Sequence, residues 1–171
     1  MQKTSQQGQS FLAVFPTDCG FGYTRCYDAL RFTEWGLERA SGDKNTVCVR
    51  KFIRLINLHK PTDIILEDIP REQEHERPRT SKLIIALAQI SMSQGCTVHF
   101  YSRAQIREAF HTHHAFTKHE IATAIGRIVP ELQSAVPPKR KVWESDSLAM
   151  PFFSAISLAL THFHFEPDHR A

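Results

Sequence analysis

The sequence predicts an α/β domain with a mixed five-stranded sheet flanked by helices. Three strand-like segments come first, followed in turn by a helix, a strand, a helix, a strand and a helical tail. The fourth strand, TDIILEDIP, has a continuous apolar centre, which is typical of a parallel strand buried on both faces. A length of 171 residues, of which 42% are hydrophobic and 23% charged, suits a single globular domain.

The ends of the chain are expected to lie outside this domain. The first residues are rich in Gln and Ser and show no periodicity, which is typical of a frayed terminus. We therefore expect a domain at 11–165, an amino-terminal tail at 1–10 and a carboxyl-terminal tail at 166–171.

The first half of the domain is rich in predicted strands. FLAVF is a short apolar run, and turn-forming residues from Pro16 to Gly22 follow it. The next two segments, YTRCYDAL and RFTEWGLERA, each suit a strand, so the three strands form a predicted meander. A helix comes next, with Asn45 or Thr46 as its cap, and Pro61 lies just beyond its end.

Helices dominate the second half. The charged segment 71–80, which follows the fourth strand, predicts an exposed loop, and CTVHFY predicts the fifth strand. Thr117 and Glu120 have the spacing of a capping box at the start of a helix. The predicted helices of this half lie at 81–94, 103–110 and 117–128, and a last apolar helix ends near Phe163.

Charge and composition limit the function classes. Twenty-one Lys and Arg against 18 Asp and Glu leave a net charge of +3, so any surface that attracts nucleic acid must be local. No run of about 18 apolar residues is present and the amino terminus is polar, so we expect a cytoplasmic protein with no membrane partner. The four cysteines form no C-x-x-C pair, which predicts reduced thiols rather than disulfides or a zinc site.

Several motifs resemble those of one family. FLAVFPTDCGFGYTRCYD resembles the first strand and turn of the RuvC-type Holliday-junction resolvases, which belong to the RNase H-like superfamily. TDIILEDIP is similar to the family's apolar strand that ends in a catalytic Glu, and FFSAISLALTHFH resembles its last helix. WGLERASGDKN, SRAQIREAF, FTKHEIATAI and PPKRKVW look like an uncharacterised bacterial branch of RuvC-like proteins. The resemblance spans residues 11–163 and implies an RNase H-like fold.

The resemblance also implies a particular chemistry. In this family carboxylates hold two Mg²⁺ or Mn²⁺ ions, one of which activates water while the other stabilises the leaving oxygen. The resemblance places Glu67 at the position of the catalytic Glu, with Asp68 after it. It places Phe15, Pro151 and Ser154 at the other acidic positions. We therefore expect a degenerate nuclease site in which cleavage is impaired or lost, and which needs no cofactor if it is inactive.

An active site rebuilt from other acids is the alternative. Asp18 would have to return to the site through a tight turn, and Asp68 alternates to the face of the strand opposite Glu67. Asp146 precedes Ser154 by eight residues, which is about 12 Å along one helix. The candidate catalytic residues are Glu67, Asp146, Asp18 and Asp68, with Glu67 and Asp146 as candidate metal ligands. This alternative predicts an Mg-dependent endonuclease that acts on branched DNA.

Basic residues predict a nucleic-acid contact. The densest basic cluster, 139–141, follows two prolines that favour an extended chain, and such a cluster suits phosphate, although an ordinary solvated linker would have the same composition. The amino terminus of the predicted helix 117–128 also favours phosphate. The candidate nucleic-acid contacts are Lys118, Lys139, Arg140, Lys141, Arg79 and Lys82.

The expected partner is nucleic acid, with DNA as the first choice. RuvC resolvases form dimers, and the apolar helix 81–94 would serve such an interface unless it faces the sheet instead. A protein-interaction scaffold that binds no nucleic acid is the remaining alternative.

Overall fold

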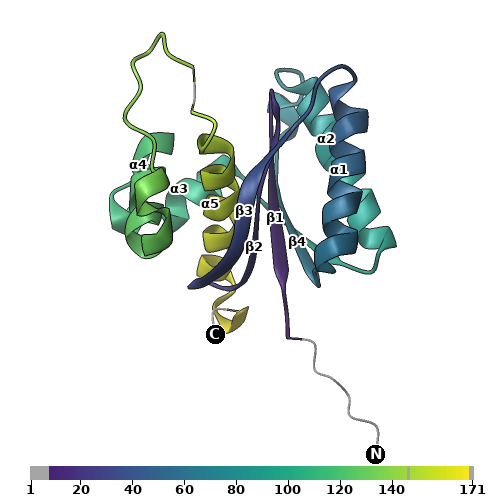
Figure 1. The fold of residues 1–171 in the computed structure, drawn as a ribbon, viewed down its shortest axis with the longest axis horizontal. Coiled ribbons are helices and arrows are strands. Elements are labelled where there is room, and N and C mark those ends of the chain that lie inside the picture. Colours follow the sequence, from purple (N-terminus) through teal and green to yellow (C-terminus); the bar gives the residue numbers. More distant parts are fainter. Residues whose placement is uncertain (1–7, 146, 170–171) are drawn as a thin grey trace, which may run out of the picture.

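The computed structural model contains the five strands that the sequence predicts, in one mixed sheet (Figure 1). The structure describes residues 8–145 and 147–169. The strands are β1 (Phe11–Thr17), β2 (Gly20–Asp28), β3 (Arg31–Arg39), β4 (Asp63–Glu67) and β5 (Thr97–Tyr101). Their order across the sheet is β3-β2-β1-β4-β5. Because β1 runs parallel to β4, the carboxyl ends of these two central strands meet at the same end of the sheet.

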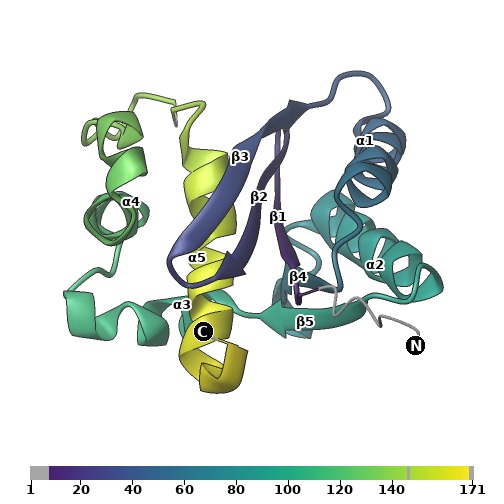
Figure 2. The ribbon, with the colours of Figure 1, turned by 60° about the horizontal axis from the view of Figure 1, so that its bottom comes forward.

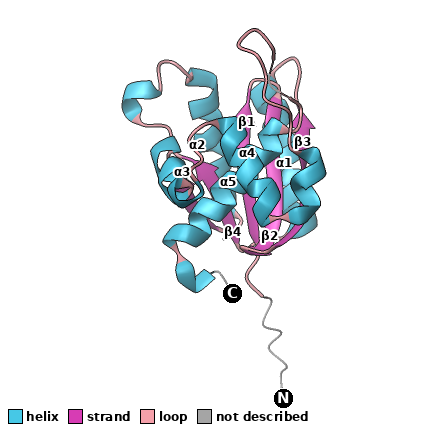
Figure 3. Ribbon diagram, turned by 90° about the vertical axis from the view of Figure 1, so that its left-hand side faces the viewer, coloured by secondary structure: helices cyan, strands magenta, loops and turns pink. Residues whose placement is uncertain are grey.

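Helices cover both faces of this sheet. The longer helices are α1 (Lys44–His59), α2 (Pro78–Ser93), α3 (Arg103–Ala109), α4 (Lys118–Ile128) and α5 (Met150–Phe165), and the short 3-10 helices are η1 (Arg71–Gln73), η2 (His111–His113), η3 (Pro130–Ala135) and η4 (Pro167–His169). α1 and α2 lie against one face, while α5 lies against the other, with α3 and α4 outside it (Figure 2, Figure 3). No helix within the described ranges is long and apolar enough to cross a membrane.

The apolar centre of β4 is explained by burial on both of its faces. Ile64 and Leu66 pack in the core under α1 and α2, whereas Ile65 packs in the core under α5. The core under α1 and α2 also includes Leu83 and Leu87, so the apolar side of α2 faces the sheet. Glu67 follows this alternation and therefore points toward the α5 side.

Several predicted boundaries differ from the structure. The cap of α1 is Asp43, whose carboxylate accepts a hydrogen bond from the Thr46 backbone N–H at 3.4 Å, rather than Asn45 or Thr46. Segment 71–80 is not loop throughout, because α2 already begins at Pro78, where a helix needs no N–H. The capping box at the start of α4 is confirmed by the structure.

The described parts of the two predicted tails contact the domain. Residues 1–7 of the tail predicted at 1–10 lie outside the described residues, but Ser10 is buried and its N–H donates to Thr62 Oγ1 at 2.9 Å. In the tail predicted at 166–171, η4 packs near the end of α5, and residues 170–171 lie outside the described residues.

Gly22 allows α5 to approach β2 closely. The predicted turn from Pro16 to Gly22 is shorter than expected, since β1 continues to Thr17 and β2 begins at Gly20. Gly22 therefore lies within β2, where a Cβ atom would be 1.9 Å from the Pro151 carbonyl oxygen. The absence of a side chain at Gly22 thus sets the position of the first turn of α5.

We expect Gly22→Ala to lower the free energy of unfolding by about 1–3 kcal/mol, because the methyl group can be accommodated only if α5 moves away from the sheet. Urea denaturation followed by circular dichroism measures this loss. Gly8→Ala is the matched control, since a Cβ atom there would meet nothing within 4 Å. Equal stability of the two variants would contradict the packing argument.

Candidate nucleic-acid interface

Glu67 is a buried carboxylate held by two arginines at the carboxyl end of β4. Its side chain is 1% exposed. Arg77, which precedes α2, donates from Nη1 to Oε1 at 2.7 Å and from Nη2 to Oε2 at 3.0 Å. Arg103, the first residue of α3, donates from Nε to Oε1 at 3.0 Å. Both carboxylate oxygens therefore carry charge-assisted hydrogen bonds, which are among the stronger kinds in proteins.

Within the described ranges, the side chains around Glu67 offer no second carboxylate for a two-metal site. Phe15 lies beside it on β1, one position beyond the paired residues Val14 and Leu66, and is 6% exposed. On α5, Pro151 is buried and Ser154 is half-buried. Mg²⁺ prefers carboxylate oxygens together with phosphates and water. The only carboxylate that the resemblance leaves in place is already neutralised by guanidinium groups.

The other candidate acids lie apart from Glu67. Asp18 is fully exposed in the turn between β1 and β2, where its Oδ1 is 3.9 Å from Arg79 Nη2. Asp68 is exposed, and its backbone N–H donates to the Tyr101 carbonyl at 2.9 Å. Asp146 lies outside the described residues. Among the residues that the structure does describe, no three His, Cys, Asp or Glu side chains form a group that could hold a metal ion.

A cleft of about 830 Å³ opens at the end of the sheet where β1 and β4 finish. Arg79, one of the predicted contacts, is fixed in it by hydrogen bonds to Asn45 Oδ1 at 3.1 Å and to the Thr17 carbonyl at 2.9 Å. The cleft has an excess of positive charge. Its basic lining residues are Arg77, Arg79, Arg103 and Lys118, and its acidic ones are Asp18 and Glu76.

A second groove, of about 580 Å³, continues from this cleft along the loop before α5. It is lined by the predicted cluster Lys139, Arg140 and Lys141, and its acidic lining residue is Glu144. Lys118, at the start of α4, lines both the cleft and the groove, so the two form one continuous basic surface. Lys82 is exposed on α2 and lines neither of them.

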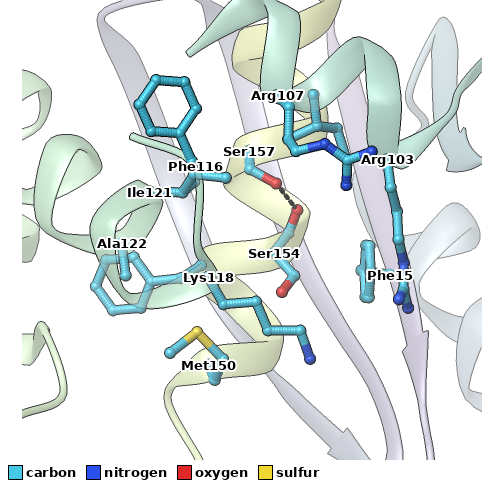
Figure 4. Close-up of a pocket in the computed structure, with 12 residues that line it drawn as sticks. Phe15, Arg103, Arg107, Phe116, Lys118, Ile121, Ala122, Met150, Ser154 and Ser157 are labelled. Carbon is cyan, nitrogen blue, oxygen red and sulfur yellow. Dashed lines mark hydrogen bonds between the residues drawn. The ribbon is translucent and has the colours of Figure 1, made fainter. Parts of the chain in front are cut away.

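A smaller pocket of about 170 Å³ opens beside the cleft (Figure 4). Phe15 and Ser154, two of the residues that the resemblance places at the family's acidic positions, are in its wall, and the Ser154 carbonyl accepts a hydrogen bond from Ser157 Oγ at 2.6 Å. The Lys118 side chain extends from α4 past Met150 toward the side on which Phe15 lies (Figure 4). The space around Phe15 and Ser154 is therefore largely apolar, with basic groups at its rim.

Two functional residues were not recognised as partners of Glu67 in the sequence. Arg77 lies in a segment predicted as exposed loop. Arg103 lies in a predicted helix, within the motif SRAQIREAF, but the resemblance assigns it no role. The signal that points to them is indirect. A carboxylate at the end of a buried strand needs compensating positive charge. The residues that the resemblance places at the other acidic positions, Phe15, Pro151 and Ser154, offer a metal ion no second carboxylate.

Comparisons with known proteins identify the fold. No protein-family model matches the chain, and no curated protein matches it significantly. The structure of T. thermophilus RuvC in complex with a Holliday junction substrate matches with a TM-score of 0.68 and 14% identity, over 94% of this chain and 96% of that chain. The yeast mitochondrial Holliday junction resolvase Ydc2 matches with a TM-score of 0.53 and 11% identity, over 95% of this chain and 83% of that chain. The chain therefore has the RuvC-type, RNase H-like fold that its motifs predicted.

Proposed function

We propose that this protein is a nucleic-acid-binding domain of RuvC fold in which metal-dependent cleavage is lost or severely reduced. The pairing of Glu67 with Arg77 and Arg103 is the observation that carries this proposal. In a two-metal mechanism carboxylates must present free oxygen atoms to the cations. Here two guanidinium groups donate three hydrogen bonds to those oxygens and supply the neutralising charge. Ligation of a cation at Glu67 would therefore compete with its pairing to both arginines.

The basic surface supports nucleic acid as the partner. Phosphate contacts come from Lys and Arg side chains and from the amino termini of helices. The cleft and the groove together present such groups over a continuous length, and α4 begins between them. DNA is the partner that we propose, because the T. thermophilus RuvC of the same fold was solved with a Holliday junction substrate.

We expect the purified protein to bind a four-way DNA junction in Mg²⁺ or Mn²⁺ without cutting it. The assay uses labelled junction and single-stranded DNA at protein concentrations that saturate binding, with a RuvC resolvase as the positive control. Robust cleavage that disappears in Glu67→Gln would contradict the proposal and would favour the alternative, an endonuclease with a rearranged acid set. Cutting that persists in Glu67→Gln would point to a contaminating nuclease, and purification to constant specific activity would then decide.

Removal of the basic cluster is expected to weaken the salt dependence of binding. Each phosphate contact contributes about 0.9 to the slope of log affinity against log salt for duplex DNA, so replacing Lys139, Arg140 and Lys141 by Ala should reduce it by about 2–3. Fluorescence anisotropy at several salt concentrations measures the slope.

A matched control removes the same charge elsewhere. Arg50 and Arg54 are exposed on α1, and Arg31 is exposed at the start of β3, outside both grooves. Replacing these three residues by Ala should leave the slope nearly unchanged. If the two triple variants behave alike, the effect is one of net charge, and the cluster at 139–141 is not a binding surface.

A further inference from the structure

Trp143 is an aromatic side chain held in solvent. It lies on the loop between η3 and α5, which projects away from the sheet beyond α4 (Figure 1). Its relative exposure is 80%, and that of its neighbour Val142 is 95%. An exposed indole gains little from folding, because large aromatic side chains normally stabilise proteins through burial. Trp143 therefore contributes little to the stability of this domain and is free to contact a partner.

The backbone around Trp143 forms an ordered turn. The Glu144 N–H donates to the Lys141 carbonyl at 3.0 Å, which puts Val142 and Trp143 at the two central positions of the turn. Glu144 Oε2 also accepts a hydrogen bond from the Lys141 N–H at 2.8 Å. The indole is thus presented at the tip of a turn that is closed on both sides. Such preorganisation lowers the entropy cost of binding.

Positive charge surrounds this indole. Lys141 Nζ lies 5.4 Å from the centre of the Trp143 ring, and the groove lined by Lys139, Arg140 and Lys118 begins beside the turn. An apolar partner would remove these cations from water and offer them no opposite charge, which is costly. A nucleotide can bind both kinds of group. Its phosphate pairs with the cations, and its base has an aromatic face that can stack on the indole.

We propose that Trp143 stacks on an unpaired base of a strand whose phosphates lie along residues 139–141. This inference rests on the proposed nucleic-acid binding and adds the class of ligand. In a continuous duplex both faces of each base are covered by neighbouring base pairs, whereas single strands and unpaired ends leave a face open. The domain therefore prefers single-stranded or locally unpaired nucleic acid over intact duplex.

The experiment compares Trp143→Ala and Trp143→Phe with the wild-type chain. Anisotropy measures binding to a labelled 20-nucleotide single strand and to the duplex of the same sequence. Trp143→Ala should weaken binding to the single strand by about tenfold and leave duplex binding within about twofold, while Trp143→Phe keeps most of the affinity. Val142→Ala, at the neighbouring position of the turn, is the matched control and should change neither affinity.

A second readout reports stacking directly. Indole fluorescence should be quenched when the single strand binds, and this quenching should be lost in Trp143→Ala, which retains Trp35 as its only tryptophan. Full affinity of Trp143→Ala for the single strand would overturn the inference while leaving nucleic-acid binding intact. Failure of the wild-type chain to bind either nucleic acid would overturn both the inference and the proposed function.

Discussion

Replacing Arg77 and Arg103 together by Ala is expected to lower the free energy of unfolding by about 3–5 kcal/mol, because it leaves the buried carboxylate of Glu67 without a partner. Glu67 is 1% exposed in the intact domain, where these two arginines supply the hydrogen bonds to both of its carboxylate oxygens. Urea denaturation of the purified variants at pH 7 measures the change. Arg107→Ala is the matched control, since Arg107 is an exposed arginine on the same helix as Arg103.

Adding Glu67→Gln to this double variant should restore most of the lost stability. The amide removes the uncompensated charge and keeps nearly the same shape. Glu67→Gln alone should cost less than the double variant, because the side chains of Arg77 and Arg103 are 23% and 48% exposed and their guanidinium groups can reach water. If the triple variant were as unstable as the double variant, the arginines would stabilise the fold by packing and not by neutralising Glu67.

Local patterns predicted most of the fold. The capping box of Thr117 and Glu120 and the apolar centre of β4 are read from neighbouring residues, and the structure confirms both. Boundaries were less accurate where two local signals compete. Asp43, Asn45 and Thr46 are all acceptable caps, and only the path of the chain into α1 selects Asp43.

The candidate site was predicted only in part, because some of its features depend on tertiary contacts. Glu67 and the cluster at 139–141 stand out in the sequence because of their position and their density of charge. The pairing of Glu67 is a tertiary contact, which joins it to Arg77 ten residues later and to Arg103 thirty-six residues later. No spacing rule connects these positions. The continuity of the cleft and the groove through Lys118 likewise depends on how α4 packs outside α5.

A second cluster of titratable groups surrounds His162 near the end of α5. The ring of His162 is fully buried, and its Nδ1 forms a hydrogen bond with Tyr101 Oη at 2.8 Å. Its Nε2 is 3.0 Å from His169 Nδ1, and the centre of the His99 ring is 4.3 Å away. His99 Nε2 in turn contacts Asp63 Oδ1 at 2.8 Å. Protonation of His162 would therefore place a charge inside the core beside two other histidines.

We expect the domain to lose stability as the pH falls from about 6.5 to about 4. Burial lowers the pKa of His162 to about 4, and repulsion from His99 and His169 acts in the same direction, while Asp63 opposes it. The unfolded chain, with a histidine pKa of about 6.5, binds this proton more readily than the folded chain. At about 1.4 kcal/mol for each pH unit, the free energy of unfolding should fall by about 3 kcal/mol over this range. Urea denaturation at pH 7, 6, 5 and 4 measures it.

His162→Gln should flatten this dependence, because glutamine can still form a hydrogen bond with Tyr101 and does not titrate. His164→Gln is the matched control, since His164 is exposed on the last turn of the same helix and its replacement should leave the slope unchanged. Asp63 affects the free energy of unfolding only at lower pH. Burial tends to raise the pKa of Asp63, but hydrogen bonds, led by that from His99, keep this pKa below its usual value. The contribution of Asp63 to the stability of the domain is therefore lost only below about pH 4. Parallel losses in the wild-type chain and His162→Gln between pH 6.5 and 4 would show that another group carries the dependence.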